Sequence, residues 1–281
     1  MELILLLGCT SSGKSDMAVE LAKKLNNSII VSCDSRQVYK ELNLLSGKVE
    51  GSIINDIYEY KGIKHYLIDI VSLDVEYNLD QYIKDYIQLI KTLKNVDYVI
   101  LTGGTGLYAR AIYDQYQLTN KVENDDLQLQ SLEELQLQLD KNDFNNSDWN
   151  NRIRLINKLT SRTSNTIINY PQYTKKTKYI IKTDNSIIKQ RVHNRIVHRI
   201  EEGMIEELES LINKYGINKF LRLGLESRYS TFYLLGMITK SELISLLDYQ
   251  TMQYVKRQNT WLNKEKEAIW ITTIEDIKPL D

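Results

Sequence analysis

The stretch Gly8-Cys9-Thr10-Ser11-Ser12-Gly13-Lys14-Ser15 follows a short apolar run, Leu3 to Leu7, and precedes an amphipathic helical pattern. Its spacing, G-x-x-x-x-G-K-S, is that of a P-loop, whose successive backbone N–H groups curl around a phosphate. Lys14 supplies a positive charge, the Ser15 hydroxyl is available to Mg²⁺, and the following helix directs its N-terminal partial charge at the same anion. The motif predicts a site for a di- or triphosphate without identifying the reaction.

Length and composition indicate one large globular domain, or one with a smaller addition. Among 281 residues, 42% are hydrophobic and 26% are charged, and the net charge is −1. This charge excludes a protein that holds nucleic acid through bulk positive charge, so any RNA contact requires local basic faces. Two cysteines, Cys9 and Cys33, exclude a disulfide scaffold and fit a reducing compartment. With no signal peptide or membrane-spanning apolar run visible, we expect a cytoplasmic protein without a membrane partner, and we also expect a monomer.

A carboxylate follows the next apolar run of the chain. Ser28 to Cys33 has the character of a buried strand, and Asp34-Ser35-Arg36-Gln37-Val38-Tyr39 comes directly after it. In a parallel α/β sheet, ligands bind at the carboxyl ends of the strands, so this strand end is expected beside the P-loop. We therefore predict a chemical role for Asp34, and the alternatives are a helix N-cap or an outer-shell ligand of Mg²⁺.

A second glycine-rich turn follows a third predicted strand. Residues 40–78 are poorly periodic, whereas residues 79–94 have the apolar spacing of a helix. Asp97 to Thr102 is then predicted as a central strand, and it ends in Gly103-Gly104-Thr105-Gly106-Leu107-Tyr108. Such a turn serves either packing or ligand contact, and its expected position beside a P-loop favours contact.

Between residues 119 and 170 the composition changes, because Gln and Asn accumulate and glycine disappears. Two helices are predicted there, around Leu127–Leu139 and Asp148–Leu159, and we interpret the segment as a helical insertion. Its first half is acidic. Its second half places three basic residues four positions apart on one helix face, namely Arg154, Lys158 and Arg162. This stripe is either a solvated surface or a contact for phosphates.

The rest of the chain is expected to return to the core. Tyr179-Ile-Ile is a predicted strand, and Asp184 is the predicted N-cap of a long helix. This helix has an apolar seam, formed by Ile188, Val192, Ile196 and Ile200, and a parallel basic seam, formed by Arg191, Arg195 and Arg199. The basic seam either forms salt bridges or binds phosphate. A capping box, Thr239-Lys-Ser-Glu242, opens the last long helix, which carries Lys256-Arg257-Gln258 near its end.

These elements predict an α/β fold: a P-loop NTPase-like parallel sheet with flanking helices and a small helical insertion. Residues 1–118 and 171–281 form the expected catalytic core, and residues 119–170 the insertion. Two reactions fit the residues. In phosphoryl transfer, the P-loop holds a nucleotide and Asp34 takes the proton of an acceptor hydroxyl. In displacement of pyrophosphate from an allylic diphosphate, the P-loop holds the leaving group and Asp34 withdraws a proton from a nitrogen nucleophile.

Four motifs occur in unbroken order between residue 3 and about residue 262. They are Gly8-x-Thr10-x-x-Gly13-Lys14-Ser15, Asp34-Ser35-x-Gln37-Val38-Tyr39, Gly103-Gly104-Thr105-Gly106-Leu107-Tyr108 and Lys256-Arg257-Gln258-x-x-Trp261. Together they resemble the tRNA dimethylallyltransferase family, also called tRNA isopentenyltransferases. The resemblance implies transfer of the dimethylallyl group of dimethylallyl diphosphate to N6 of the adenosine just 3′ of the anticodon, with Mg²⁺ as cofactor and pyrophosphate as product.

The resemblance also implies roles for individual residues. The diphosphate would be held by Gly8, Thr10, Ser11, Ser12, Gly13, Lys14, Ser15 and Arg257, with Mg²⁺ on Ser15. Asp34 would be the base at N6, and Thr10 and Arg257 would complete the catalytic set. The flipped-out adenosine would meet Ser35, Gln37, Thr105 and Gly106, and the insertion, with Arg154, Lys158 and Arg162, would meet the anticodon stem-loop of the tRNA partner.

The chain departs from the family pattern at several positions. Family members usually carry a second arginine five residues before the position of Arg257, and Met252 stands there. The family's Gly-Tyr-x-Glu is Gly224-Leu225-Glu226-Ser227 in this chain. Three other functions therefore stay open: an AMP dimethylallyltransferase, a P-loop small-molecule kinase, and a catalytically impaired tRNA-binding homologue. The insertion and the Lys256-Arg257-Gln258 helix favour tRNA over AMP.

Overall fold

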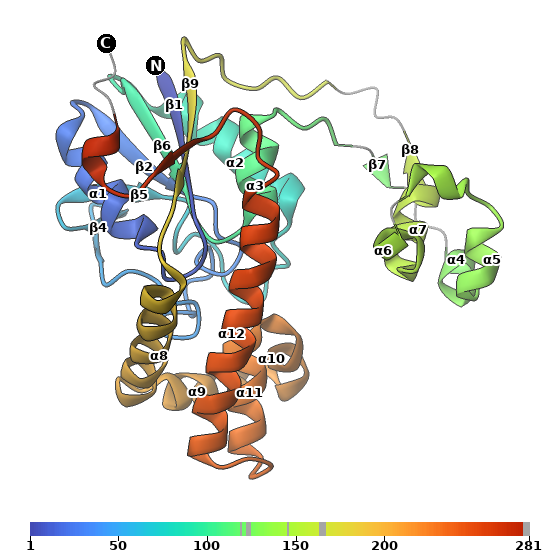
Figure 1. Cartoon of the computed structure of the whole chain (residues 1–281). Helices are drawn as coiled ribbons and strands as arrows, with labels where there is room; N and C mark the ends of the chain where they lie inside the picture. Colours follow the sequence, from blue (N-terminus) through green and yellow to red (C-terminus); the bar gives the residue numbers. More distant parts are fainter. Residues whose placement is uncertain (119, 122–124, 145, 163–166, 278–281) are drawn as a thin grey trace. The chain divides into compact units, whose positions relative to one another are not determined.

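The computed structural model describes residues 1–118, 120–121, 125–144, 146–162 and 167–277, and of residues 120, 121, 125, 147, 161 and 162 the backbone alone (Figure 1). The chain divides into two compact units, Met1–Asp114 with Pro171–Asp281, and Gln115–Tyr170. Among the helices described, none combines the length and the apolar character that a bilayer crossing requires.

An eight-stranded sheet forms the centre of the first unit, in the order β10-β9-β1-β6-β2-β5-β4-β3. Neighbouring strands from β10 to β5 pair in parallel, whereas β5, β4 and β3 pair antiparallel at one edge. The strands are β1 Glu2–Leu7, β2 Ser28–Ser32, β3 Ser52–Ile54, β4 Ile57–Tyr60, β5 Ile63–Tyr66, β6 Tyr98–Thr102, β9 Lys176–Ile181 and β10 Ile269–Ile271. The predicted parallel α/β sheet is confirmed.

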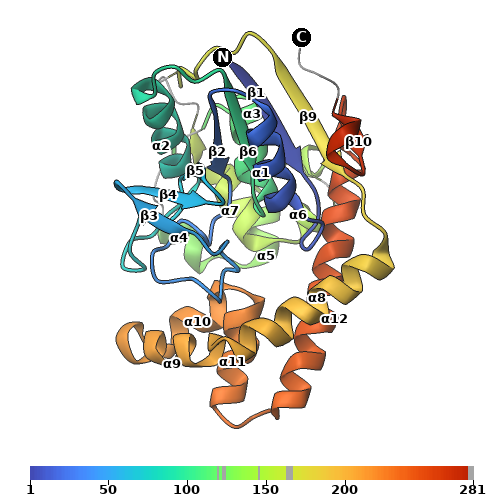
Figure 2. The same cartoon turned by 90° about the vertical axis from the view of Figure 1, so that its left-hand side faces the viewer.

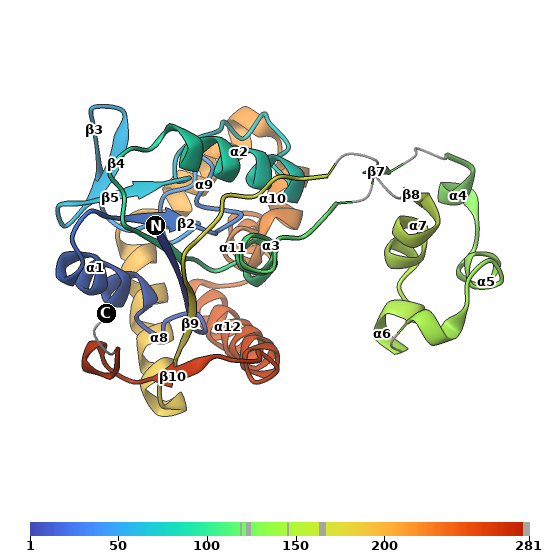
Figure 3. The same cartoon turned by 90° about the horizontal axis from the view of Figure 1, so that it is seen from above.

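Helices cover both faces of this sheet (Figures 1 and 3). On one face, α1 (Lys14–Lys24) packs against alternate residues of the central strands, including Ile4 and Leu6 of β1. On the other face lie α2 (Leu79–Thr92) and α3 (Gly106–Tyr113). Because both faces are covered, β1, β2 and β6 are almost wholly buried, which explains their continuous apolar runs.

The antiparallel edge was not predicted. Two-residue turns join its strands: Asn55-Asp56, with φ of 49° and 61°, and Lys61-Gly62, with φ of 51° and 79°. Left-handed residues at both turn positions are typical of tight hairpins, and Asn, Asp and Gly tolerate this conformation well. Strands of three or four residues are too short for a clear two-residue period, so these turn residues were the available signal.

Five helices lie beyond the carboxyl ends of the parallel strands (Figure 2). They are α8 Asn185–Glu201, α9 Met204–Tyr215, α10 Ile217–Leu223, α11 Leu225–Leu234 and α12 Lys240–Leu262. Asp184 accepts a hydrogen bond from Ser186 N as the N-cap of α8, and Thr239 and Glu242 form the capping box of α12, both as predicted. The predicted apolar seam of α8 is buried. This layer brings α8 and α12 beside the strand ends that carry the P-loop.

The second unit is more broken than predicted. The first expected helix is divided into α4 (Asp125–Leu129) and α5 (Leu132–Gln136), because Ser131 and Glu134 form a capping box that starts a new helix. The second expected helix is also divided, into α6 (Asn146–Trp149) and α7 (Arg152–Thr160). The unit also contains the 3₁₀ helix η1 Lys141–Asp143 and a strand pair, β7 Asn120–Lys121 with β8 Ser161–Arg162. Its small core consists of Leu127, Leu135, Leu155 and Ile156.

Candidate active site

The P-loop lies between β1 and α1, where the sequence places it. The ammonium group of Lys14 donates hydrogen bonds to two backbone oxygens of the loop, Gly8 O at 2.9 Å and Cys9 O at 2.7 Å. The hydroxyl oxygens of Ser11 and Ser12 are buried and have no hydrogen-bond partner among the described residues. Buried polar atoms are normally paired, so this loop has the unpaired hydroxyl groups expected of a binding site for oxygen-rich anions.

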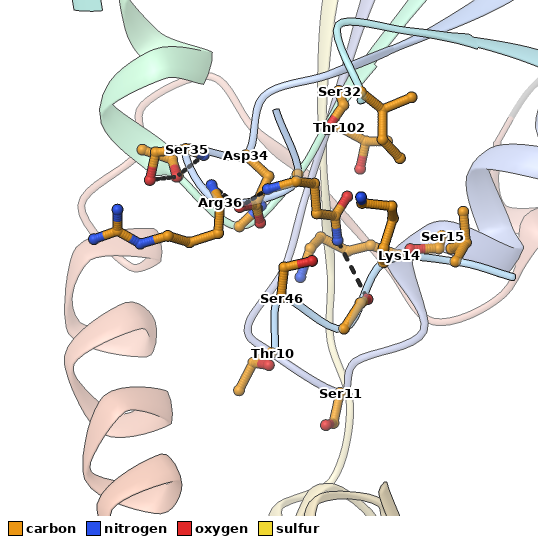
Figure 4. Close-up of a pocket in the computed structure, with 18 of the residues that line it drawn as sticks. Thr10, Ser11, Lys14, Ser15, Ser32, Asp34, Ser35, Arg36, Ser46 and Thr102 are labelled. Atoms are coloured by element: carbon orange, nitrogen blue, oxygen red, sulfur yellow. Dashed lines mark hydrogen bonds between the residues drawn. The ribbon is translucent and has the colours of Figure 1, made fainter. Parts of the chain in front are cut away.

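A cavity of about 730 Å³ opens beside the loop (Figure 4). It is lined by residues of the P-loop, of the strand end at Asp34, of the glycine-rich turn after β6 and of the helical layer. Nearly all of the P-loop and adenosine residues predicted in the first unit line it; Gly8, Ser12 and Gly106 do not. Gly8 and Gly106 instead line a second cavity, of about 310 Å³, formed by α3, α12 and the turn after β6.

Asp34 is held by backbone N–H groups from both neighbouring strand ends. Its Oδ1 accepts hydrogen bonds from Arg36 N at 2.8 Å and Gln37 N at 3.4 Å, and its Oδ2 accepts one from Gly104 N at 3.1 Å. The first two bonds resemble the capping alternative, yet the carboxylate also lines the cavity. A Cβ atom at Gly104 would lie 2.5 Å from Asp34 Oδ2, so this close approach requires glycine.

Ser35 and Thr105 link the two strand ends further. Ser35 N donates to Thr105 Oγ1 at 2.9 Å, and the two hydroxyl groups are 3.1 Å apart. The side chain of Gln37 donates to Gly47 O at 3.3 Å, which joins the strand end to the loop that carries Ser46 and Lys48. The predicted adenosine-contacting residues Ser35, Gln37 and Thr105 therefore form one connected wall of the cavity.

The last helix contacts the P-loop directly. Gln258 Oε1 of α12 accepts a hydrogen bond from Thr10 N at 2.8 Å. Arg257 is exposed at the cavity and lies over the ring of Tyr254, 5.7 Å from its centroid. Trp261 packs against Gly106, where a Cβ atom would lie 2.8 Å from the indole ring. Met252 is half-buried and is not among the residues that line the cavity.

The basic seam of α8 divides into two environments. Arg195 Nη2 donates to Thr10 Oγ1 at 3.0 Å, and Arg191 Nη1 lies 3.5 Å from Ser11 O, so two arginines border the P-loop. Arg199 instead forms a buried ion pair with Glu226, with an Nη1–Oε1 distance of 3.2 Å. Salt bridging, one of the two predicted alternatives, thus applies to Arg199 among the three.

The pKa values of the cations beside the P-loop are lowered, because these side chains are buried and lie close to one another. Burial, together with the neighbouring Arg195, lowers the pKa of Lys14 to about 8, and the Asp34 carboxylate opposes part of this shift. Burial and the neighbouring Arg199 lower the pKa of Arg195 to about 10. Burial thus disfavours the charged forms of both side chains. A multiply charged anion bound in this site would stabilise those charged forms.

A glutamate outside the predicted set anchors one wall of the cavity. Glu207 of α9 accepts hydrogen bonds from three successive backbone N–H groups, those of Asn43 at 3.2 Å, Leu44 at 2.9 Å and Leu45 at 3.0 Å. Leu45 lines the cavity, and the loop continues to Gly47, the partner of Gln37. Residue spacing alone does not predict this contact, because a glutamate in the first turn of a helix usually stabilises only that helix.

Glu207→Ala is expected to lower the free energy of unfolding by about 1–3 kcal/mol, because three backbone N–H groups lose a charged acceptor. Urea denaturation followed by circular dichroism measures this change. Glu206→Ala is the matched control, because Glu206 is the exposed neighbour on the same helix turn. Equal stability of the two variants would contradict the anchoring role.

The basic residues of the insertion have acidic partners in their own unit. Arg154 pairs with Asp148 at 3.7 Å and Lys158 with Asp143 at 3.5 Å, and all four side chains are at least partly exposed. Such pairs are weak, so they do not prevent these cations from contacting phosphates. The Arg162 side chain lies outside the described part of the chain. An RNA-contacting role for all three stays a prediction.

The residues present fit Mg²⁺ only together with a ligand that brings its own oxygens. Among the described residues there is no group of three or more His, Cys, Asp or Glu side chains arranged to hold a metal ion. Ser15 lines the cavity at the start of α1. Mg²⁺ at phosphate sites typically takes few protein ligands and keeps several waters, so Ser15 with diphosphate oxygens is a suitable set.

Known proteins match this chain along most of its length. The IPP transferase family model matches residues 37–265. The chain is 35% identical to tRNA dimethylallyltransferase 2 of Shewanella sediminis, over 93% of this chain and 89% of the relative. It is also 35% identical to tRNA dimethylallyltransferase 1 of Azobacteroides pseudotrichonymphae, over 92% of this chain and 88% of the relative.

Solved structures show the same fold. A tRNA isopentenylpyrophosphate transferase from Bacillus halodurans matches with a TM-score of 0.68 at 24% identity, over 96% of this chain and 89% of that one. A eukaryotic dimethylallyltransferase described as acting on tRNA matches with a TM-score of 0.74 at 19% identity, over 96% of this chain and 73% of that one. From the family model and the sequence identities, this chain belongs to the tRNA dimethylallyltransferase, or IPP transferase, family of enzymes.

Proposed function

We propose that this chain transfers the dimethylallyl group of dimethylallyl diphosphate to N6 of the adenosine at position 37 of tRNA, just 3′ of the anticodon, and releases pyrophosphate. The observation that carries the proposal is a single cavity lined by both the Asp34 carboxylate and the P-loop residue Lys14, whose pKa the carboxylate raises. Displacement of pyrophosphate by a nitrogen nucleophile requires a base and a binding site for diphosphate, and this cavity contains both. Membership of the family supports the same reaction.

In this reaction, N6 forms a bond to C1 of the allylic group as the bond from C1 to the diphosphate oxygen breaks. The electron pair of the broken bond leaves with pyrophosphate, and the proton of N6 goes to Asp34. The Asp34 oxygens are fixed by three backbone N–H groups, so the base needs little reorganisation during the reaction.

The charge of the diphosphate is balanced by the P-loop. The hydroxyls of Thr10, Ser11, Ser12 and Ser15 bind its oxygens, and the Lys14 ammonium turns from its loop carbonyls to the anion. Arg257 adds a cation from α12. Ser15, together with diphosphate oxygens, would hold Mg²⁺, which would supply further positive charge for the leaving group.

The acceptor is a base taken out of its stack in the anticodon loop. Ser35, Gln37, Thr105 and Gly106 offer hydroxyl, amide and backbone groups for such a base. The second unit, with Arg154, Lys158 and Arg162, contacts the phosphates of the anticodon stem-loop. A cytoplasmic location and a monomeric state stay predictions from the sequence.

A label-transfer assay tests the proposal. Purified protein with Mg²⁺ and radiolabelled dimethylallyl diphosphate is incubated with unmodified tRNA, with AMP or without acceptor, and nucleosides are separated after digestion. Label in N6-dimethylallyladenosine from tRNA alone is the expected result. Label in AMP would assign the chain to the AMP dimethylallyltransferases. Binding of tRNA without transfer would indicate an impaired homologue, and hydrolysis of ATP with a small acceptor would indicate a kinase.

A further inference from the structure

Glu226 is a second half-buried carboxylate in the lining of the cavity, besides Asp34. It lies in the first turn of α11, and its side chain is 24% exposed. Burial opposes its ionisation, but Arg199 and Arg195 hold the pKa of Glu226 below its usual value, so the group is charged at neutral pH. The cavity thus contains a negative charge that repels a diphosphate and the phosphates of RNA, and the transfer reaction itself gives this charge no role.

The salt bridge to Arg199 uses only one oxygen of this carboxylate. Glu226 Oε1 accepts from Arg199 Nη1 at 3.2 Å, whereas Oε2 accepts no hydrogen bond from another residue in the described parts of the chain. Arg199 Nη2 is buried and has no partner there either. If the two groups faced each other squarely, a bidentate salt bridge would pair both sets of atoms. The second oxygen is instead left available to a ligand in the cavity.

The glutamate stands one residue earlier than in the family pattern Gly-Tyr-x-Glu, which is Gly224-Leu225-Glu226-Ser227 in this chain. Ser227 is buried, and its hydroxyl donates to Phe220 O at 2.9 Å, within the helical layer. Successive side chains of a helix point about 100° apart. A carboxylate at position 226 therefore lines the cavity, while the side chain at position 227 packs inside the layer.

We propose that Glu226 accepts a hydrogen bond from the ribose 2′-hydroxyl of the adenosine that is to be modified. This inference rests on the proposed function. An adenosine within an RNA chain has two donor groups, the N6 amine and the 2′-hydroxyl, because its 3′ and 5′ oxygens are esterified. The N6 amine goes to Asp34, and neither the diphosphate nor the allylic group offers a donor. The 2′-hydroxyl is the donor that remains for Glu226.

The two carboxylates border the same part of the cavity. Asp34 follows a strand end and Glu226 belongs to the helical layer, yet both act electrostatically on Tyr254 and on Arg195. A nucleoside bound there presents its base edge to Asp34 and its ribose to Glu226. The bond from the hydroxyl is charge-assisted, because Arg199 keeps Glu226 ionised, and it distinguishes RNA from DNA at the modified nucleotide.

A tRNA assembled with 2′-fluoroadenosine at position 37 tests this contact, because fluorine removes the hydroxyl donor but keeps an RNA-like sugar. The unaltered protein is expected to transfer label to this tRNA with a kcat/KM about 10- to 100-fold below that for the unsubstituted tRNA, and to bind it more weakly by a similar factor. This is the effect of losing a hydrogen bond to a charged group. Fluorescence anisotropy measures binding apart from transfer.

Three protein variants are compared on both tRNAs. Glu226→Gln keeps the shape without the charge, and its preference for the hydroxyl is expected to fall to about two- to tenfold. Glu226→Leu with Arg199→Met removes both members of the buried pair, so no charge is left unpaired, and is expected to bind the two tRNAs within about twofold of each other. Glu50→Gln changes an exposed carboxylate that lines the same cavity and should keep the full preference.

Equal affinity of the unaltered protein for the two tRNAs would overturn the proposal, as would full preference for the hydroxyl in the double variant. A preference that follows 2′-fluorination of the next nucleotide instead would overturn it too, because Glu226 would then contact a neighbouring ribose. If the double variant does not fold, Glu226→Gln decides: an unchanged preference overturns the contact. Absence of transfer to the unsubstituted tRNA would instead overturn the proposed function.

Discussion

Asp34→Asn is expected to leave tRNA binding intact and to lower the rate of dimethylallyl transfer roughly 100-fold or more. The amide has the shape of the carboxylate but does not accept the N6 proton. Its oxygen still accepts from Arg36 N and Gln37 N, so the strand end keeps most of its structure, while the bond from Gly104 N to the second oxygen is lost. Single-turnover transfer of label to unmodified tRNA measures the chemical step apart from product release.

Asp80→Asn is the matched control, because it makes the same chemical change on a half-exposed residue of α2, where it removes only a surface ion pair with Lys84. It is expected to transfer label at the rate of the unaltered protein. An Asp34→Asn protein with unchanged single-turnover rate would remove Asp34 from its role as base. A protein that instead loses tRNA affinity would show that Asp34 holds the acceptor and does not act on its proton.

The arrangement around Asp34 was the most predictable part of the site. A P-loop, a carboxylate and a glycine-rich turn each follow an apolar strand, and parallel strands present their carboxyl ends at one edge of the sheet. The structure accordingly joins Asp34 to Gly104 and Ser35 to Thr105, residues 70 positions apart. Strand order supplies this proximity, so no knowledge of side-chain packing was required.

The contributions of the helical layer were not predictable in the same way. Gln258 and Arg195 both meet Thr10, from helices far apart in the sequence, and Glu207 anchors the loop at Leu44. Each contact depends on how α8, α9 and α12 pack against the strand ends. The spacing of three arginines on α8 gave a basic face, but only packing assigns Arg195 to the P-loop and Arg199 to Glu226.

Short elements account for the errors in the fold. The apolar spacing of residues 127–139 is that of one continuous helix, so periodicity does not reveal the break between α4 and α5. Ser131 and Glu134 do, because they form a capping-box pair, which signals the start of a new helix. The antiparallel strands of residues 52–66 were missed because tight turns rather than apolar alternation define them. In both places the capping and turn residues were more informative than the apolar periodicity.

Lys14→Met is expected to lower kcat/KM for dimethylallyl diphosphate by roughly 10²–10³, the cost of removing one positioned electrostatic contact to a leaving group. Lys14 donates to Gly8 O and Cys9 O, and methionine has a similar length without charge or donors. Lys61→Met, an exposed lysine paired with Asp16, is the control and should change kcat/KM little. Steady-state label transfer at saturating tRNA measures the effect.

The pH dependence of the same constant separates charge from shape. Because burial lowers the pKa of Lys14 to about 8, the free enzyme carries this cation below pH 8 and loses it above. In the unaltered protein, kcat/KM is therefore expected to fall about tenfold per pH unit above this value, whereas Lys14→Met should show no break there. Arg195, whose pKa burial lowers only to about 10, stays charged over this range and does not produce the break. The same break in Lys14→Met would show that another group titrates. A flat profile up to pH 9.5 in the unaltered protein would mean that the P-loop keeps Lys14 charged without its anion.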